Sequence, residues 1–327
     1  SSRKYPFVGF EQEREIGNDL LRVENLSVAI EGEMIIENIS FILNPGDKTV
    51  FIGQNDIQQT TLLRALMDDV EDNWTVTGDI KWGVTSSRSY LPKDNTKDFD
   101  TSDSILDWLR QFVLTKEEDD NTYLRGFLGR MLFKGEESLK AVNVLSGGEK
   151  VRVMLSKMML QRANVLVLDD PTNHLDLESI SALNDGLKSF KGSILFASHD
   201  HEFINTIANH IVVLGKSGVI DRIGETYDDF LDNAKAIEIA KQITNVTHNH
   251  PDAILAVSIY IEILYTLLSS KSLSLHEKKE IIIKTLEKYN YSMPKTIVEY
   301  RVKVDFDLTC ETSLLVAVAA ILETENF

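Results

Sequence analysis

The chain has 327 residues, enough for about two domains, and its formal charge is −17 because 51 Asp and Glu outnumber 34 Lys and Arg. An apolar share of 43% is ordinary for a folded globular protein and excludes a disordered chain. The acidic balance argues against a basic surface that binds nucleic acid. The single cysteine, Cys310, excludes an internal disulfide, so we expect a reducing compartment, the cytoplasm. The longest apolar run, 253–268, is shorter than the roughly 20 residues that span a bilayer, so we expect no membrane segment.

The first elements along the chain have the order of a phosphate-binding loop. Residues 1–20 are polar and mixed and are interpreted as a linker tail. Gly53 directly follows the predicted strand 48–52, the third along the chain, and a helical pattern begins soon after it at residue 60. The predicted strands here are 21–26, 34–42, 48–52, 80–84 and 89–91, and the predicted helices are 60–67 and 102–114.

The rest of the chain divides into two patterns. Up to residue 233, buried strands alternate with helices, which predicts an α/β fold with a parallel sheet. After residue 233 the periodicity is helical, and residues 235–327 carry 10 Lys and Arg against 12 Asp and Glu. We therefore predict two unlike domains, 21–233 and 234–327. The predicted helices are 146–162, 177–190, 234–268, 276–289 and 312–322, and the predicted strands are 165–168, 193–197 and 211–214, followed by a hairpin over 218–223.

The strongest chemical signal is the run LSGGEK at 145–150. Ser146, Gly147 and Gly148 stand at the start of a predicted helix, where free backbone N–H groups and the positive helix end favour an anion. An ordinary serine N-cap followed by a glycine turn would use the same residues.

Two further motifs follow at the ends of buried strands. Asp169 and Asp170 come after the strand 165–168, where a carboxylate can hold Mg²⁺ or, alternatively, cap a helix. His199 comes after the strand 193–197. Three such motifs in this order are typical of one nucleotide site.

With these motifs, residues 1 to about 233 resemble an ATP-binding cassette (ABC) domain, which is a P-loop NTPase fold. The runs PTNHLD at 171–176, WGVT at 82–85 and SYLPKDN at 89–95 are most similar to the second cassette of the ABC-F proteins. These are translation-associated ATPases with two cassettes in one chain. The resemblance implies ATP with Mg²⁺ as the ligand and a second cassette as the partner, in a homodimer or heterodimer. It makes the ribosome a possible partner, although the linker that reaches the ribosome in that family would precede residue 1.

The resemblance also implies roles for individual residues. Ser146, Gly147 and Gly148 would contact the γ-phosphate of ATP that is bound on a facing cassette. Asp170 and His199 would be catalytic, and Thr60 and Asp169 would hold the metal. The nucleotide-binding residues of the chain's own site would be Gly53, Asn55, Gln59, Thr60, Thr61 and Lys93. Asp176 lies where the family's dimer-contact loop lies, and Ile30 lies near the position of the aromatic residue that stacks on adenine.

The phosphate loop departs from the family pattern G-x-x-x-x-G-K-[ST]. Gln58 replaces the second glycine, Gln59 replaces the lysine, and Asp56 stands where a glycine is frequent. Glutamine offers a neutral amide, and the loss of one charged hydrogen bond costs roughly 1.5–3 kcal/mol. Asp56 adds repulsion of phosphate. We therefore expect an impaired loop beside an intact signature, so that the chain completes a partner's site better than its own.

The second domain resembles a fragment of the ADP-ribosylglycohydrolases, which are all-helical enzymes with two Mg²⁺ ions. The likeness lies in 247–251, 300–312 and 323–327. The family's acidic metal motifs are absent from 234–327, so we expect no hydrolase activity. His248 and His250 could ligate a metal, or could mark a polar helix corner.

With an ADP-ribosyl hydrolase disfavoured by the missing acidic motifs, three further hypotheses for function stand. The first is an ABC-F-type cassette that binds Mg-ATP and contributes to its hydrolysis in a head-to-tail pair. The second is a degenerate, non-hydrolytic cassette that completes a partner's ATP site. The third is a chimeric chain whose C-terminal fragment is catalytically incomplete.

Overall fold

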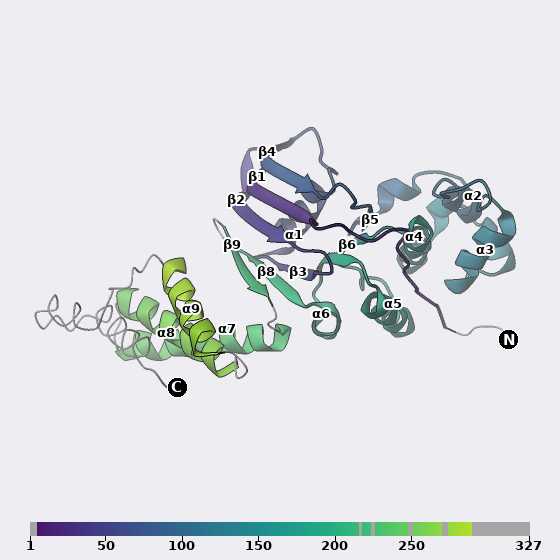
Figure 1. The fold of residues 1–327 in the computed structure, drawn as a ribbon. Coiled ribbons are helices and arrows are strands. Elements are labelled where there is room, and N and C mark those ends of the chain that lie inside the picture. Colours follow the sequence, from purple (N-terminus) through teal and green to yellow (C-terminus); the bar gives the residue numbers. More distant parts are fainter. Residues whose placement is uncertain (1–4, 216–217, 224–225, 248–250, 270–273, 290–327) are drawn as a thin grey trace, which may run out of the picture. The chain divides into compact units, whose positions relative to one another are not determined.

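A computed structural model describes residues 5–215, 218–223, 226–247, 251–269 and 274–289 (Figure 1). The chain separates into two compact units, Ser1–Tyr227 and Asp228–Phe327, and each is considered separately. Within the described part of the chain, no helix combines the length and apolarity needed to cross a membrane.

An antiparallel sheet forms one layer of the first unit. Its strand order is β2-β1-β4, with β1 at Leu21–Ile30, β2 at Glu33–Leu43 and β4 at Trp74–Trp82. The turn between β1 and β2 places Gly32 at φ +83°, a left-handed conformation that glycine adopts without a steric cost. Alternate residues of β1, among them Leu21 and Val23, are buried, because only one face of this sheet lies on the core.

The second sheet is mostly parallel and carries the candidate site. Its order is β5-β6-β7-β3-β8-β9, and only the β8–β9 pair is antiparallel. The strands are β5 Arg88–Leu91, β6 Val165–Asp169, β7 Ser193–Ala197, β3 Lys48–Ile52, β8 His210–Leu214 and β9 Val219–Ile223. Every residue of β6 and β7 is buried, as expected of strands covered on both faces. The segments that follow the carboxyl ends of β3, β5, β6 and β7 therefore meet at one edge of the sheet.

Helices surround this sheet and form a separate lobe in the first unit. Figure 1 shows α2, at Ile105–Arg110, and α3, at Asn121–Arg130, beside α4, at Gly147–Gln161. The remaining helices are α1 Asp56–Leu66, α5 Leu177–Ser189 and α6 His201–Ile207, with short 3₁₀ turns η1 Thr96–Phe99, η2 Gly135–Leu139 and η3 Val142–Val144. Buried Leu and Met side chains of α4 fix that helix against its neighbours, which holds its first turn in place.

The described part of the second unit is helical. It contains α7 from Tyr227 to Thr247, which begins at the last residue of the first unit, then α8 Pro251–Ser269 and α9 Leu275–Lys288. The helices α8 and α9 pack together, and Glu262, 4% exposed in its side chain, accepts hydrogen bonds from Lys288 at 2.8 Å and Tyr289 at 2.7 Å. This pairing compensates the burial of the Glu262 carboxylate.

The α/β cassette fold predicted from the sequence is confirmed, with several corrections to its elements. The first helix begins at Asp56 rather than at residue 60, and β4 begins at Trp74 rather than at residue 80. The helix expected over 102–114 is limited to Ile105–Arg110, while α3 and α6 were not predicted. Residues 234–268, expected to be helical, lie in two helices, α7 and α8. The helix expected over 312–322 and the histidines His248 and His250 lie outside the described residues.

Candidate functional site

The signature residues begin α4, as the sequence predicts. Ser146 is the N-cap, and its hydroxyl donates to Glu149 Oε2 at 2.8 Å while its backbone N–H donates to the same oxygen at 2.9 Å. The hydrogen bond from the Ser146 backbone lowers the pKa of Glu149, so this carboxylate stays charged and fixes the cap. Ser146 and Gly147 are exposed. The first turn of a 15-residue helix is therefore open to an anion.

The absence of side chains at Gly147 and Gly148 permits a close contact with His174. A Cβ atom on Gly148 would lie 2.6 Å from the His174 carbonyl oxygen, and one on Gly147 would lie 3.1 Å from the imidazole. The PTNHLD segment thus packs directly on the signature. Asp176, expected in a dimer-contact loop, caps α5 by accepting the Ser179 N–H at 2.7 Å.

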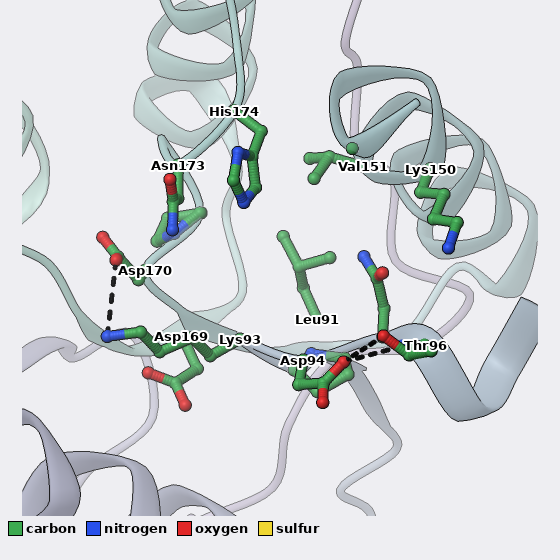
Figure 2. Close-up of a pocket in the computed structure, with 14 residues that line it drawn as sticks. Leu91, Lys93, Asp94, Thr96, Lys150, Val151, Asp169, Asp170, Asn173 and His174 are labelled. Carbon is green, nitrogen blue, oxygen red and sulfur yellow. Dashed lines mark hydrogen bonds and ion pairs between the residues drawn. The ribbon is translucent and has the colours of Figure 1, made fainter. Parts of the chain in front are cut away.

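A small cavity connects the signature with the edge of the parallel sheet. Its volume is about 180 Å³, and Figure 2 shows Lys93 and Asp170 on one side of it and His174 and Lys150 on another. The lining comes from the segments after β5 and β6 and from the first turns of α4.

The two predicted metal ligands lie close together, with Asp169 at the end of β6 and Thr60 in α1. Asp169 is 3% exposed, and its burial raises its pKa to about 6, although a hydrogen bond with Thr60 opposes the rise. Its Oδ2 atom is buried and has no hydrogen-bond partner. An orphaned buried oxygen beside a threonine hydroxyl is a partial set of the oxygen ligands that Mg²⁺ takes.

Lys93 already supplies a cation at this point. Its ammonium lies 3.6 Å from Asp170 Oδ2 (Figure 2) and 2.8 Å from Asp56 Oδ2, and its charge also acts on Asp169. His199 Nε2 lies 2.8 Å from the other oxygen of Asp56. A metal ion would compete with the Lys93 ammonium for these carboxylates, and phosphate would meet the Asp56 charge. The residues of the chain's own site therefore do not fit a metal-bound nucleotide.

Several polar groups of the phosphate loop bond to one another or to β3. Asn55 caps α1 by accepting the Gln58 N–H at 2.9 Å, and Gln58 Oε1 accepts the Gln54 N–H at 3.0 Å. Gln59 is buried and donates to the Phe51 carbonyl at 2.9 Å, so its amide turns back toward β3. A Cβ on Gly53 would lie 3.0 Å from Gln58 Oε1, which shows how tightly the loop is filled.

The structure thus brings most of the predicted site residues to one edge of the sheet. Several of them bond to one another or to the backbone. Thr61 is buried in α1, 2% exposed, and Ile30 is half-buried at the end of β1. The pairing of Asp56 with Lys93 and His199 was not foreseen. The signal that could have found it is the position of each residue after a different strand of the parallel sheet, β3, β5 and β7.

Comparison with known proteins gives a consistent result. Residues 36–173 match the family model described as ABC transporter. The chain is 53% identical over 247 residues to the uncharacterized ABC transporter ATP-binding protein YkpA of Bacillus subtilis, covering 75% of this chain and 44% of that protein. It is 36% identical over 238 residues to the probable ATP-binding protein YbiT of Escherichia coli O157:H7, covering 73% and 44%. It is 28% identical over 230 residues to the ABC transporter F family member 2 of Arabidopsis thaliana, covering 69% and 33%.

A solved structure shows the same fold. The protein cbiO1 of Clostridium perfringens, described as part of the ABC transporter complex cbiONQ, matches with a TM-score of 0.50 and 19% identity over 71% of this chain and 97% of that one. The chain spans less than half the length of the curated relatives named above. None of these matches supports the resemblance of 234–327 to ADP-ribosylglycohydrolases. The chain therefore carries an ABC-type ATP-binding cassette that is related to the ABC-F proteins.

Proposed function

We propose that this cassette acts as one half of a head-to-tail cassette pair and presents its signature to ATP held by the phosphate loop of the facing cassette. The observation that carries the proposal is the exposed, capped first turn of α4, with Gly147 and Gly148 supported by His174. The cassette contributes to ATP hydrolysis at the partner's loop. Of the two elements that the cassette could contribute, the signature and the phosphate loop, the phosphate loop contributes less.

The chemistry of the signature is electrostatic. The first N–H groups of a helix lack intrahelical partners, and each favourable charge interaction with the helix end contributes about 0.3–1 kcal/mol. Because Glu149 holds the N-cap through Ser146, these donors are oriented before an anion arrives, which is how donors assist phosphoryl transfer. When ATP binds the partner's loop, the Mg²⁺ that accompanies it neutralises phosphate charge.

Turnover at the chain's own loop is not the function that the contacts favour. Asp170, the expected catalytic carboxylate, is ion-paired with Lys93, and Gln59 in the lysine position is bonded to the backbone of β3. No observation on the described residues points to hydrolysis of ADP-ribose or to contact with a ribosome.

A complementation experiment tests the proposal with two forms of this chain. The loop-repaired form carries Asp56→Gly, Gln58→Gly and Gln59→Lys, which restores the family pattern, together with Ser146→Arg, which blocks its signature. The second form is the unaltered chain, whose signature is intact. After Mg-ATP binding by the repaired form is established by calorimetry, the ATPase rate is measured for each form alone and for the mixture.

We expect each form alone to be nearly inactive and the mixture to be active, because only the mixture combines a working loop with a working signature. The matched control is a mixture in which the unaltered chain is replaced by its Ser146→Arg variant, and this mixture should be inactive. A repaired form that binds Mg-ATP but gains no activity from the unaltered chain would refute the proposed role.

A further inference from the structure

The Asp56 side chain lies at the point where a phosphate would approach α1. Asp56 is the first residue of this helix, and its carboxylate bonds Lys93 Nζ and His199 Nε2, each at 2.8 Å. The helix start, a lysine and a histidine are the groups that bind a phosphate in other sites. Here all three face a carboxylate that belongs to the chain itself.

Lys93 lies where a metal ion bound to the phosphate would lie. Its ammonium lies within 4 Å of both Asp56 and Asp170, and Asp169 with its orphaned Oδ2 lies close by. A divalent metal would use the same oxygens. The pair therefore reproduces, with side-chain charges, the contact between a phosphate and its metal.

The loop residues support this closed arrangement. Gln58 Nε2 also donates to the Gly215 carbonyl at 3.4 Å, while its Oε1 accepts the Gln54 N–H. Two backbone N–H groups of the loop, those of Gln54 and Gln58, are thus engaged by the chain's own side chains, and both ends of the Gln58 amide are used. Opening the loop requires these bonds to break together with the Asp56–Lys93 pair.

We propose that Asp56 and Lys93 form an internal substitute for a phosphate and its metal ion, which closes this chain's own nucleotide site to ATP. Neutralising Asp56 converts the closed site into an anion site whose cation is Lys93, so that ATP binds there without Mg²⁺. The inference builds on the proposed one-sided role and supplies its cause, because a loop held closed leaves the signature as the working half.

The experiment measures ATP binding to the full chain by calorimetry, in Mg²⁺ and in EDTA. The variants are Asp56→Asn, Asp56→Ser, and Asp56→Asn combined with Lys93→Gln. The matched control is Asp68→Asn, which removes one exposed carboxylate beyond the other end of α1 and so makes the same change in net charge. Inorganic triphosphate is titrated in parallel to separate phosphate recognition from base recognition.

We expect the unaltered chain and Asp68→Asn to bind ATP weakly. Asp56→Asn and Asp56→Ser should bind roughly 10- to 100-fold more tightly, because one charged hydrogen bond of Lys93 is released to the ligand. The gain should persist in EDTA within about twofold and should be lost on adding Lys93→Gln. A gain of binding cannot result from unfolding, so a poorly folded variant does not imitate this result.

Three results would overturn the inference. The first is that the unaltered chain binds ATP as tightly as the Asp56 variants do. The second is that the control Asp68→Asn shows the same gain in affinity, and the third is that the gain remains when Lys93→Gln is added. These failures are separate from failure of the proposed function. Asp56→Asn can gain ATP binding while the complementation mixture stays inactive, and the mixture can be active while Asp56 proves indifferent.

Discussion

Stability above neutral pH should depend on a single buried histidine, His210. Its side chain is 1% exposed at the start of β8, with Nδ1 3.2 Å from Asp47 and Nε2 2.5 Å from Asp221. Burial alone would lower the pKa of His210, but the hydrogen bonds and charges of these two carboxylates outweigh it and raise the pKa to about 9. The charged imidazolium therefore links the turn before β3 to β8 and β9.

The pKa of His210 sets the pH range of the effect. In the unfolded chain the ordinary value is 6.5, and in the folded chain it is about 9. A difference of this size corresponds to about 3 kcal/mol in the free energy of unfolding. Because the pKa is higher in the folded state, the contribution is complete below about pH 6.5 and is lost as the pH rises through about 9.

The assay is urea unfolding of the first unit between pH 5.5 and 9.5, for the unaltered chain and for His210→Gln. Glutamine keeps a hydrogen-bonding group but does not titrate, so the difference in unfolding free energy should be constant below about pH 6.5 and shrink by about 3 kcal/mol by pH 9.5. The control variant is His201→Gln, which makes the same substitution at an exposed histidine of the first unit. A difference that stays flat above pH 6.5, or that grows, would refute the reasoning.

Other predictions concern the close contacts. Gly148→Ala should destabilise the first unit by about 1–3 kcal/mol, because its Cβ would lie 2.6 Å from the His174 carbonyl, and scanning calorimetry measures this directly. Gly126→Ala, where a Cβ meets nothing within 4 Å inside α3, should instead stabilise by about 0.5–1 kcal/mol. Lys288→Met should weaken the α8–α9 pair by about 1–3 kcal/mol, because it removes the ammonium that pairs with the buried Glu262 carboxylate, and hydrogen exchange in α8 should then quicken.

The sequence predicted the elements whose pattern is local. The apolar runs of β3, β6 and β7 and the cap of α4 were found because burial on both faces and an N-cap serine leave signals in a few adjacent residues. The helix α3 was missed because Gly126 and Gly129 lower its propensity. In the fold, the buried side chains Leu124, Phe127 and Leu128 outweigh that loss.

The contacts that decide the state of the site could not be predicted in the same way. Asp56, Lys93 and His199 are separated by 37 or more positions along the chain, and they meet only because their strands are neighbours or near neighbours in one parallel sheet. The sequence indicated that the Asp56 carboxylate repels phosphate, but repulsion is only one of its two electrostatic effects on the site. The structure adds the attraction that holds its carboxylate at Lys93 and His199.

The two parts of the cassette tolerate substitution differently, for a physical reason. Around the phosphate loop, the residues that depart from the family pattern all have partners: Asp56 in Lys93 and His199, Gln58 in the loop backbone, and Gln59 in β3. A set of substitutions that satisfy one another leaves a stable, closed loop. The signature has no such freedom, because any side chain at Gly148 collides with backbone. This difference accounts for the proposed function, in which the chain's own nucleotide site is lost while the surface that would serve a partner's site is kept.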